Sequence, residues 1–333
     1  MKIKIVLLVL IPLLTACDVI KHAYVTNELK DNFDLSLTEN KELIQVVFCG
    51  TGSPQKNSER GQACTLIAAG GQLFLFDAGE NAMRNLEAAN VDSKHLTKAF
   101  ITHFHSDHFN GLASLVNHTW IYGRTDPFDV YGPTGISQVV EGLTQAYALD
   151  AQYRNSHFVS AKSEAFATPH TIEFLVGSVQ QRVYSKDGVT IDAWKVAHEP
   201  VDPALGYLLS YKGKKVFISG DTKVDNIYKP ALINADLVIH EAMAMHLMEQ
   251  GIDVAKKQGW EDKVVLMDHV MEYHSSTLNI AKNAQEMNVK KVALTHLIPE
   301  PNNFIARILF EYGMSDFYDG EVILAEDNMK IKL

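Results

Sequence analysis

Four side chains able to bind a metal ion crowd into the seven residues Thr102–His108 (THFHSDH). They are His103, His105, Asp107 and His108, and the apolar run before them is typical of a strand. Imidazole nitrogen and carboxylate oxygen are ligands that zinc takes, and a site that keeps a position for water uses only a few protein ligands per ion. Past the strand end the side chains of His103 and His105, two residues apart, point to the same side. The next turn then brings Asp107 and His108 close to them. One loop could therefore serve two adjacent metal ions, which share an activated water and stabilise both oxygens of a displacement.

Two adjacent ions need more ligands than one loop supplies, and the second half of the chain contains candidates. Most of them stand at the end of a predicted strand or in the loop after it. Fourteen histidines scattered at random would seldom fall this way. The candidates are His198, Asp221, His240, His274 and His296.

The elements that must position these residues alternate along the chain. Apolar, β-branched runs closed by glycine turns predict strands, and runs with helical spacing lie between them. This alternation, with hairpins in between, favours an α/β fold of two mixed sheets covered by helices. Strand patterns occupy residues 43–50, 64–79, 98–104, 127–132, 190–199, 204–222, 235–242, 290–297 and 321–333, and helical patterns occupy residues 81–91, 110–123, 135–149 and 278–288.

The N-terminus has the pattern of a bacterial lipoprotein signal. A charged start precedes the apolar run IVLLVLIPLL, which is too short to span a bilayer as a stable helix. The sequence Leu14–Cys17 (LTAC) resembles a lipobox, which implies cleavage before Cys17 and a lipid on its sulfur. An uncleaved anchor or a simple secretory peptide is the alternative. We therefore predict a signal peptide (1–17), a polar tether (18–42) and a globular domain (43–333), anchored by lipid to a bacterial membrane on its extracytoplasmic, periplasmic side.

The charge of the chain argues against a large nucleic-acid surface. The formal net charge is −10, and removal of Lys2 and Lys4 with the signal peptide makes it −12. Neutralising the phosphates of a nucleic acid needs an excess of Lys and Arg, and no local run supplies one. Nucleic acid is therefore not expected as a partner, whereas small anions attracted by a local metal charge are compatible with this composition.

Two cysteines besides Cys17 flank the segment between the first two predicted strands. In an oxidising compartment Cys49 and Cys64 could form a disulfide. We favour two buried thiols that act as small hydrophobic side chains, because pairing depends on a geometry that spacing alone does not give.

The motifs together resemble the metallo-β-lactamase fold superfamily, and within it the branch of ribonuclease Z, related phosphodiesterases and arylsulfatase-type enzymes. The resemblance covers residues 43–333 and implies an αββα sandwich of two mixed sheets flanked by helices. Its motifs stand in the expected order: GTGSP (Gly50–Pro54), FDAG (Phe76–Gly79), THxHxDH (Thr102–His108), HEPVDPALGY (His198–Tyr207), GDT (Gly220–Thr222), HEA (His240–Ala242), HSS (His274–Ser276) and LTH ending at His296.

The resemblance implies a role for each site residue. One metal ion is expected on His103, His105 and His198, and the other on Asp107, His108 and His296, with Asp221 bridging. Two divalent ions are implied, zinc first, with manganese or iron as substitutes. A water activated between them would be the nucleophile, and Asp107 could orient it or take its proton. His274 is expected to protonate the leaving oxygen, with Glu241 steering it, while Asp77 and His240 are expected to support loops and imidazole tautomers.

The expected substrate is a small anionic ester, either a phosphodiester or an aryl sulfate, because related extracytoplasmic enzymes act as cyclic-nucleotide phosphodiesterases or arylsulfatases. Ribonuclease Z carries a basic arm for tRNA between its GY strand and GDT, and here Tyr207–Gly220 leaves room only for a hairpin, which disfavours tRNA 3′ processing. Arg154 and His157 could reach over the metals and bind the ester, or Arg154 could form a surface ion pair.

A cysteine in place of Asp221 would be typical of a β-lactamase, which argues against that activity. A lactonase and a non-catalytic metal-holding lipoprotein are two further hypotheses.

Overall fold

The computed structural model describes residues 18–27, 32–55, 59–157 and 166–333. The chain divides into two compact units, one ending at Asp34 and the other spanning Leu35–Leu333. In the first unit residues 18–27 are helical. The predicted signal peptide and Cys17 lie outside the described residues, and among those described no helix is long and apolar enough to cross a membrane.

The second unit begins eight residues before the predicted start of the domain. Helix α2 (Ser36–Glu39) packs on the first sheet and buries Leu37 in the core below it. The hydroxyl group of Tyr211 donates a hydrogen bond of 2.7 Å to the carbonyl oxygen of Lys41. Residues 35–42, expected as tether, are therefore part of the compact unit in the structure.

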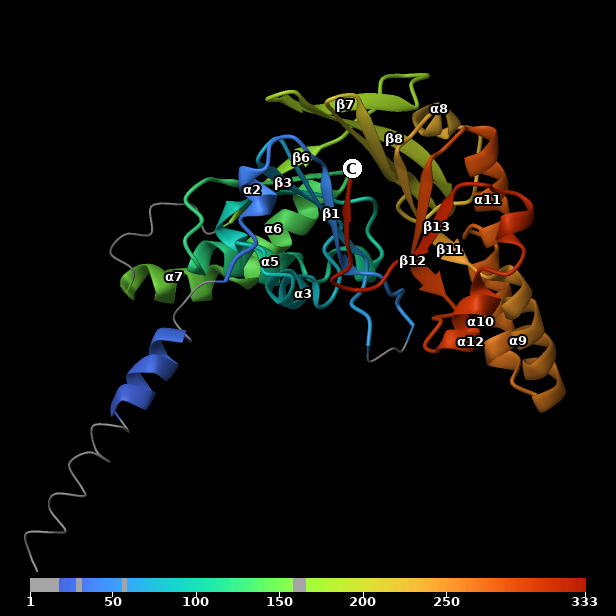
Figure 1. Ribbon diagram of the computed structural model, residues 1–333, viewed down its shortest axis with the longest axis horizontal. Coiled ribbons are helices and arrows are strands. Elements are labelled where there is room, and N and C mark those ends of the chain that lie inside the picture. The colour runs from blue at the N-terminus through green and yellow to red at the C-terminus, as the bar shows by residue number, and fades with distance from the viewer. Residues whose placement is uncertain (1–17, 28–31, 56–58, 158–165) are drawn as a thin grey trace, which may run out of the picture. The chain divides into compact units, whose positions relative to one another are not determined.

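Two seven-stranded mixed sheets form this unit, so the predicted fold class is confirmed (Figure 1). The first sheet has the order β14-β1-β2-β3-β4-β5-β6 and the second β13-β12-β11-β10-β9-β8-β7. The first contains β1 (Gln45–Gly50), β2 (Cys64–Ala69), β3 (Gln72–Phe76), β4 (Leu96–Phe100), β5 (Phe128–Gly132), β6 (Ala167–Thr171) and β14 (Lys330–Lys332). The second contains β7 (Gln180–Lys186), β8 (Val189–His198), β9 (Val201–Tyr211), β10 (Lys214–Ile218), β11 (Leu237–Met243), β12 (Lys291–Ile298) and β13 (Glu321–Leu324).

The two sheets pack face to face through a shared apolar core. The central strands are buried on both faces, which explains their nearly continuous apolar sequences. Aromatic side chains fill the layer between the sheets: the ring of Tyr207 lies 5.6 Å from those of both Phe76 and Phe100. These contacts hold the end of β4, from which the metal-binding loop departs, against the second sheet.

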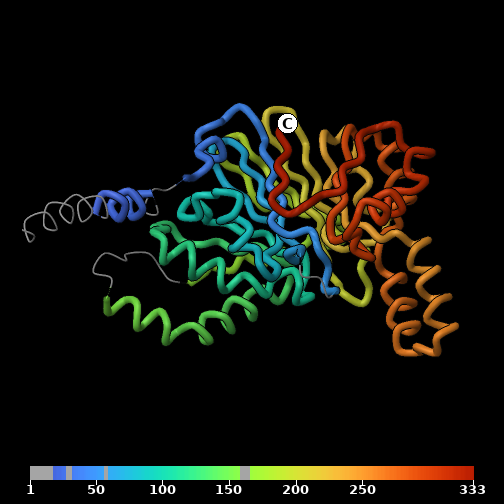
Figure 2. Tube along the Cα trace, turned by 60° about the horizontal axis from the view of Figure 1, so that its bottom comes forward, coloured from blue at the N-terminus to red at the C-terminus, as the bar shows by residue number. Residues whose placement is uncertain are grey.

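Helices cover the outer face of each sheet. On the first sheet α3 (Ala82–Ala88), α5 (Leu112–Ile121) and α6 (Ile136–Ala146) bury their apolar sides. On the second, α8 (Lys229–Leu232), α11 (Thr277–Glu286) and α12 (Phe304–Phe310) contribute to a separate core. The remaining helices are α4 (Ser106–Phe109), α7 (Ala148–His157), α9 (Met245–Gln258) and α10 (Glu261–Met271), with short 3₁₀ turns at Ser93–His95 and Met314–Asp316. Figure 2 shows α9 and α10 as a helical hairpin that projects from the second sheet.

The segment that would carry a tRNA-binding arm is a tight hairpin, as predicted. Strands β9 and β10 pair antiparallel with Tyr211 opposite Lys214. Lys212 and Gly213 alone form the turn, with φ angles of 46° and 77°. Two successive left-handed residues are typical of a two-residue hairpin turn, so no arm interrupts this part of the chain.

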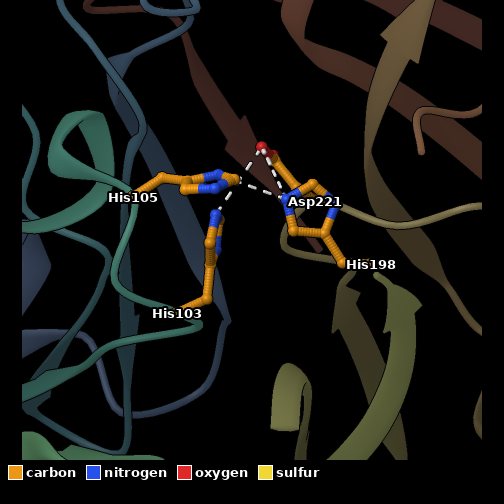
Figure 3. A group of neighbouring side chains, drawn as sticks. All are labelled: His103, His105, His198 and Asp221. Carbon is orange, nitrogen blue, oxygen red and sulfur yellow. Dashed lines mark hydrogen bonds and ion pairs between the residues drawn. The ribbon is translucent and has the colours of Figure 1, made fainter. Parts of the chain in front are cut away.

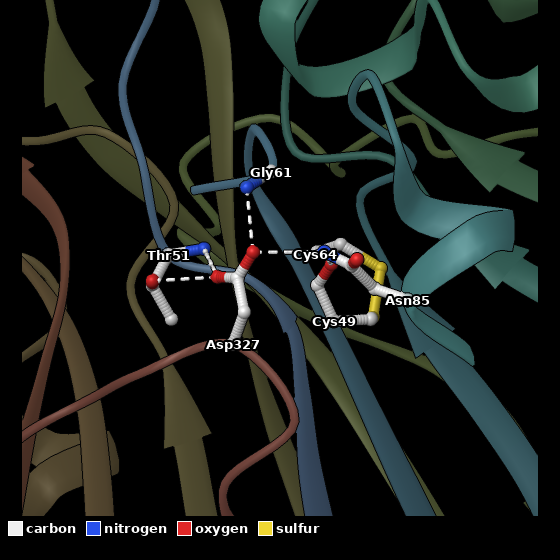
Figure 4. The surroundings of a disulfide bond; sticks show 6 residues. All are labelled: Cys49, Thr51, Gly61, Cys64, Asn85 and Asp327. Carbon is white, nitrogen blue, oxygen red and sulfur yellow. Dashed lines mark hydrogen bonds between the residues drawn. A yellow bond between two sulfur atoms is a disulfide. The ribbon is translucent and has the colours of Figure 1, made fainter. Parts of the chain in front are cut away.

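The prediction of two free cysteines is wrong, because Cys49 and Cys64 form a disulfide (Figure 4). The pairing of β1 with β2 shifts register between Phe48 and Gly50, so that Gly50 lies opposite Cys64. This irregularity places the Cα atoms of the two cysteines 4.9 Å apart, within the range that a disulfide can bridge.

Candidate metal centre

The seven predicted ligands converge from the two sheets at one end of the sandwich. The loop after β4 and helix α4 carry four of them, and the end of β8, the loop after β10 and strand β12 carry the other three. Potential ligand atoms of His103, His105, His198 and Asp221 all lie within 4.8 Å of one another (Figure 3). The same distance limit groups the remaining three predicted ligands, Asp107, His108 and His296.

Asp221 lies between the two groups, as expected of a bridging carboxylate. Its Oδ2 is 3.9 Å from Nε2 of His103 and 4.0 Å from Nε2 of His198 in the first group. The same oxygen is 3.3 Å from Nε2 of His108 and 3.4 Å from Nε2 of His296 in the second group. One carboxylate can therefore contact ions held in both groups.

The polar atoms of this cluster fit metal ions. Nε2 of His103, Nε2 of His108 and Oδ1 of Asp221 are buried without a hydrogen-bond partner in the described structure. Buried polar atoms are nearly always paired, so several unpaired ligand atoms within one cluster fit a site for cations. Burial lowers the pKa of His103 and of His198, which keeps their imidazole rings neutral and able to bind metal. Burial raises the pKa of Asp221, but the neighbouring His296 and His108 outweigh it and hold that pKa well below its usual value.

Asp77 fixes the metal-binding loop and the tautomer of His108. It has a φ of 58°, and its carboxylate accepts hydrogen bonds from the backbone N–H and the hydroxyl group of Thr102, at 2.8 and 2.9 Å. Its Oδ2 also lies 2.7 Å from Nδ1 of His108. A proton held on Nδ1 leaves Nε2 of His108 free to bind metal.

A β-bulge aims His296 into the site. Along the parallel pair β11–β12, Glu241 lies opposite Thr295 and Ala242 opposite Leu297, so His296 is the extra residue. Its φ of 47° is uncommon for a side chain other than glycine. Bulges of this kind redirect one side chain next to an active site. A second register shift, between Val196 and His198 along β8–β9, has the same effect at the end of β8.

Glu241 connects the loops that carry Asp221 and His274. Its Oε1 accepts hydrogen bonds from the backbone N–H groups of Ser275, at 2.8 Å, and Thr222, at 3.3 Å. Its Oε2 lies 3.3 Å from Nδ1 of His274. Burial lowers the pKa of His274, but Glu241 and Asp221 more than compensate and raise it above its ordinary value. His274 is therefore favoured in its protonated form, as a general acid requires.

His240 lies outside the cluster. Its Nε2 is 3.0 Å from the hydroxyl group of Tyr228, and its Nδ1 is 2.6 Å from the carbonyl oxygen of Glu241. It can support the strand that carries Glu241, but among the described residues it contacts none of the seven predicted ligands.

Arg154 and His157 are not brought to the metal cluster. Both lie on α7, where Arg154 pairs with Asp150 at 2.9 Å, one helical turn earlier, and His157 is exposed. No contact between described residues joins either of them to the predicted ligands.

Two residues of the site were not identified from sequence. Thr102 positions Asp77, and its place inside the THxHxDH motif was the available signal. Tyr273 stands just before the HSS motif; its carbonyl oxygen is 3.3 Å from Nδ1 of His198, and its ring lies 5.2 Å from that of His198. No pattern in the sequence marked it.

Comparisons with known proteins agree with this geometry. The family model described as Anti-Pycsar protein Apyc1 matches residues 44–289. Ribonuclease Z of Mycobacterium sp. strain KMS is 30% identical over 260 residues, which cover 77% of this chain and 85% of the relative. The crystal structure of the short form of human tRNase Z superposes with a TM-score of 0.62 at 25% identity, covering 86% of this chain and 98% of that one. A diphosphatase of the PhnP family shares the fold, with a TM-score of 0.59 at 15% identity and coverage of 87% and 97%.

The two mixed sheets, the paired His/Asp groups at their common end and these similarities point to one conclusion. The chain has the metallo-β-lactamase fold of a metal-dependent hydrolase related to ribonuclease Z, and it belongs to the family of Anti-Pycsar protein Apyc1.

Proposed function

We propose that this protein hydrolyses phosphodiesters of small molecules with two divalent metal ions, zinc in the first place. The observation that carries the proposal is the position of Asp221 between two groups of ligands, with the His274–Glu241 pair next to it. His103, His105 and His198 would hold one ion, Asp107, His108 and His296 the other, and Asp221 both. Two such ions lower the pKa of a bound water and stabilise the attacking and leaving oxygens.

The chain supplies proton transfer on both sides of the reaction. Oδ2 of Asp107 lies 3.1 Å from Nε2 of His296 and 3.4 Å from Nε2 of His108. This places the Asp107 carboxylate at the centre of the cluster, where it can orient the attacking water and accept its proton. On His274, Nδ1 faces Glu241, which leaves Nε2 to protonate the departing ester oxygen.

Phosphorus is favoured over sulfur by the relatives, since ribonuclease Z and a diphosphatase are named for cleaving phosphate linkages. Cleavage of tRNA is the second candidate, because the curated relatives are named ribonuclease Z and the similar human structure is named tRNase Z. The two-residue β9–β10 turn and the net charge of −10 both argue against it. An arylsulfatase and a lactonase could use the same metal ligands. The assay below distinguishes an arylsulfatase from a phosphodiesterase directly.

We also propose that the enzyme works outside the cytoplasm, held to a bacterial membrane by a lipid on Cys17. The lipobox-like sequence supports this location. The Cys49–Cys64 disulfide adds support, because disulfides persist in oxidising compartments and are rare in the cytosol. The membrane would be contacted through this lipid, and a small anionic ester would be the partner in the site.

The test uses residues 18–333, loaded with zinc and checked by metal analysis, with manganese and iron in parallel. Hydrolysis of bis-p-nitrophenyl phosphate and of p-nitrophenyl sulfate is compared in the wild type, Asp221→Ala and His274→Ala. His246→Ala is the control, because His246 contacts the carbonyl oxygen of Leu309 outside the cluster.

We expect the wild type to hydrolyse the phosphodiester. Asp221→Ala should lose both metal binding and this turnover. In His274→Ala the rate should fall by about 10²–10⁴-fold with the metals retained, since loss of a general acid has this size. Turnover of the sulfate alone would mean that the protein is an arylsulfatase and not a phosphodiesterase. Two bound metals without turnover of either ester would favour a non-catalytic metal-binding protein.

A further inference from the structure

Tyr273 is the aromatic side chain that contacts both the first metal group and the predicted acid. Its ring lies 5.2 Å from that of His198, edge to face at 84°, and 4.9 Å from that of His274, tilted by 49°. The ring is half-buried, so part of it remains open to a ligand. Nothing in the metal chemistry described above uses this ring.

The backbone fixes this position independently of the side chain. The carbonyl oxygen of Tyr273 is 3.3 Å from Nδ1 of His198. The next peptide is held as well, because the N–H of Ser275 donates to Glu241 and the carbonyl oxygen of Ser275 accepts from the N–H of Met243. A change of the Tyr273 side chain should therefore leave the loop, His198 and His274 where they are.

The phenol group has no structural task of its own. Among the described residues none forms a hydrogen bond with the Tyr273 hydroxyl.

The place of the ring relative to His274 indicates which part of a substrate it meets. The oxygen that receives a proton from His274 must lie within hydrogen-bond distance of that imidazole. The leaving group is this oxygen together with the carbon group attached to it, and the half-buried ring of Tyr273, 4.9 Å from that of His274, offers that carbon group a surface next to the acid. A flat aromatic leaving group can pack on such a ring, whereas a small alkyl group offers little contact area.

We propose that Tyr273 forms the leaving-group subsite of this enzyme and selects anionic esters whose leaving group carries an aromatic ring next to the ester oxygen. The role of this subsite in catalysis rests on the proposed hydrolytic function, whereas its preference for an aromatic group concerns binding alone. It can therefore be tested without turnover.

The test measures binding of phenylphosphonate and methylphosphonate to the metal-loaded protein by titration calorimetry. The two probes carry the same anionic group and differ in the aromatic ring. We expect phenylphosphonate to bind about tenfold more tightly, as one favourable aromatic contact provides. Tyr273→Ala should remove this preference and Tyr273→Phe should keep it, with unchanged metal content in both. Tyr273→Leu replaces the alanine variant if that variant does not fold.

Three results would overturn the subsite: equal affinity of the wild type for both probes, a preference that survives in Tyr273→Ala, or loss of the preference in Tyr273→Phe. A parallel assay with methyl p-nitrophenyl phosphate separates the two proposals. If Tyr273→Ala raises its KM about tenfold with little change in kcat, the ring acts on the leaving group during turnover. If the wild type hydrolyses no ester but shows the phosphonate preference, the hydrolytic function fails and the aromatic subsite stands.

Discussion

Replacing Asp77 by asparagine should weaken one of the two metal sites through the tautomer of His108. The new asparagine can keep the left-handed backbone, which this residue type tolerates well. The backbone N–H of Thr102 requires an acceptor where Oδ1 now stands, so the amide oxygen must take that position. The amide NH₂ then faces Nδ1 of His108 and donates to it. The ring proton moves to Nε2, the atom that should bind metal.

The size of the effect follows from one hydrogen bond. The contact between Asp77 and His108 is 2.7 Å long, and a hydrogen bond to a charged group contributes about 1.5–3 kcal/mol. This corresponds to roughly a 10- to 100-fold loss of metal affinity, the range found when residues behind a metal ligand are removed. Only the ion on Asp107, His108 and His296 should be affected, so one site stays tight and the other weakens.

Chelator competition with zinc measures both affinities, and metal analysis gives the number of ions bound. Asp129→Asn is the matched control, because Asp129 forms a similar 2.8 Å contact with His170 away from the cluster. Two tight sites in Asp77→Asn would refute the tautomer argument. Equal weakening of both sites would show instead that the substitution disturbs the whole loop.

Three further predictions follow from other parts of the site. Glu241→Gln removes the charge that raises the pKa of His274, so the pKa of His274 should fall. Because His274 carries its proton only below this pKa, the basic limb of the pH–rate profile should move to lower pH. Replacing Cys49 and Cys64 by alanine should lower the free energy of unfolding by about 3 kcal/mol, measured in denaturant, since the bond joins residues 15 apart. Gly79→Ala should abolish metal binding at the loop, because its Cβ would lie 2.3 Å from the carbonyl oxygen of Asp107.

Each of these predictions has a distinct contrary outcome. A basic limb that does not move in Glu241→Gln would mean that another group is the acid. A double cysteine variant as stable as the wild type would show that the two strands need no covalent link. For Gly79→Ala the control is Gly142→Ala, where an added Cβ meets nothing within 4 Å. Metal binding should be unchanged in that control and lost in Gly79→Ala, and retention in both would show that the loop can shift.

The sequence predicted the part of the site that depends on the ends of strands. Ligands such as His103 follow a strand directly, and strands of one sheet end at a common edge, so their assembly could be expected without coordinates. Asp221 could be placed in the same way, at the end of the β9–β10 hairpin. The two mixed sheets followed from the alternation of strand and helix patterns.

What sequence reasoning missed depends on departures from regular pairing. The LTHL segment has an ordinary strand pattern, and nothing in it shows that His296 is the extra residue of a bulge. The same holds for Cys49, whose contact with Cys64 requires the shifted register of β1 and β2. For Arg154 the sequence left two interpretations open, and the structure shows the surface ion pair: its partner Asp150 stands four residues earlier, a spacing that favours a local ion pair on a helix.

The arrangement of ligands on both sheets also has a consequence for stability. The loop with His103 and Asp107 belongs to the first sheet, whereas His198, Asp221 and His296 belong to the second. Without metal, unpaired ligand atoms of both sheets are buried against each other, which opposes the packing of the sandwich at this end. A metal ion that binds only the folded arrangement stabilises it by mass action. Metal ions held at this centre would therefore link the two halves of the fold as well as serve catalysis, and we expect their removal by a chelator to lower the free energy of unfolding.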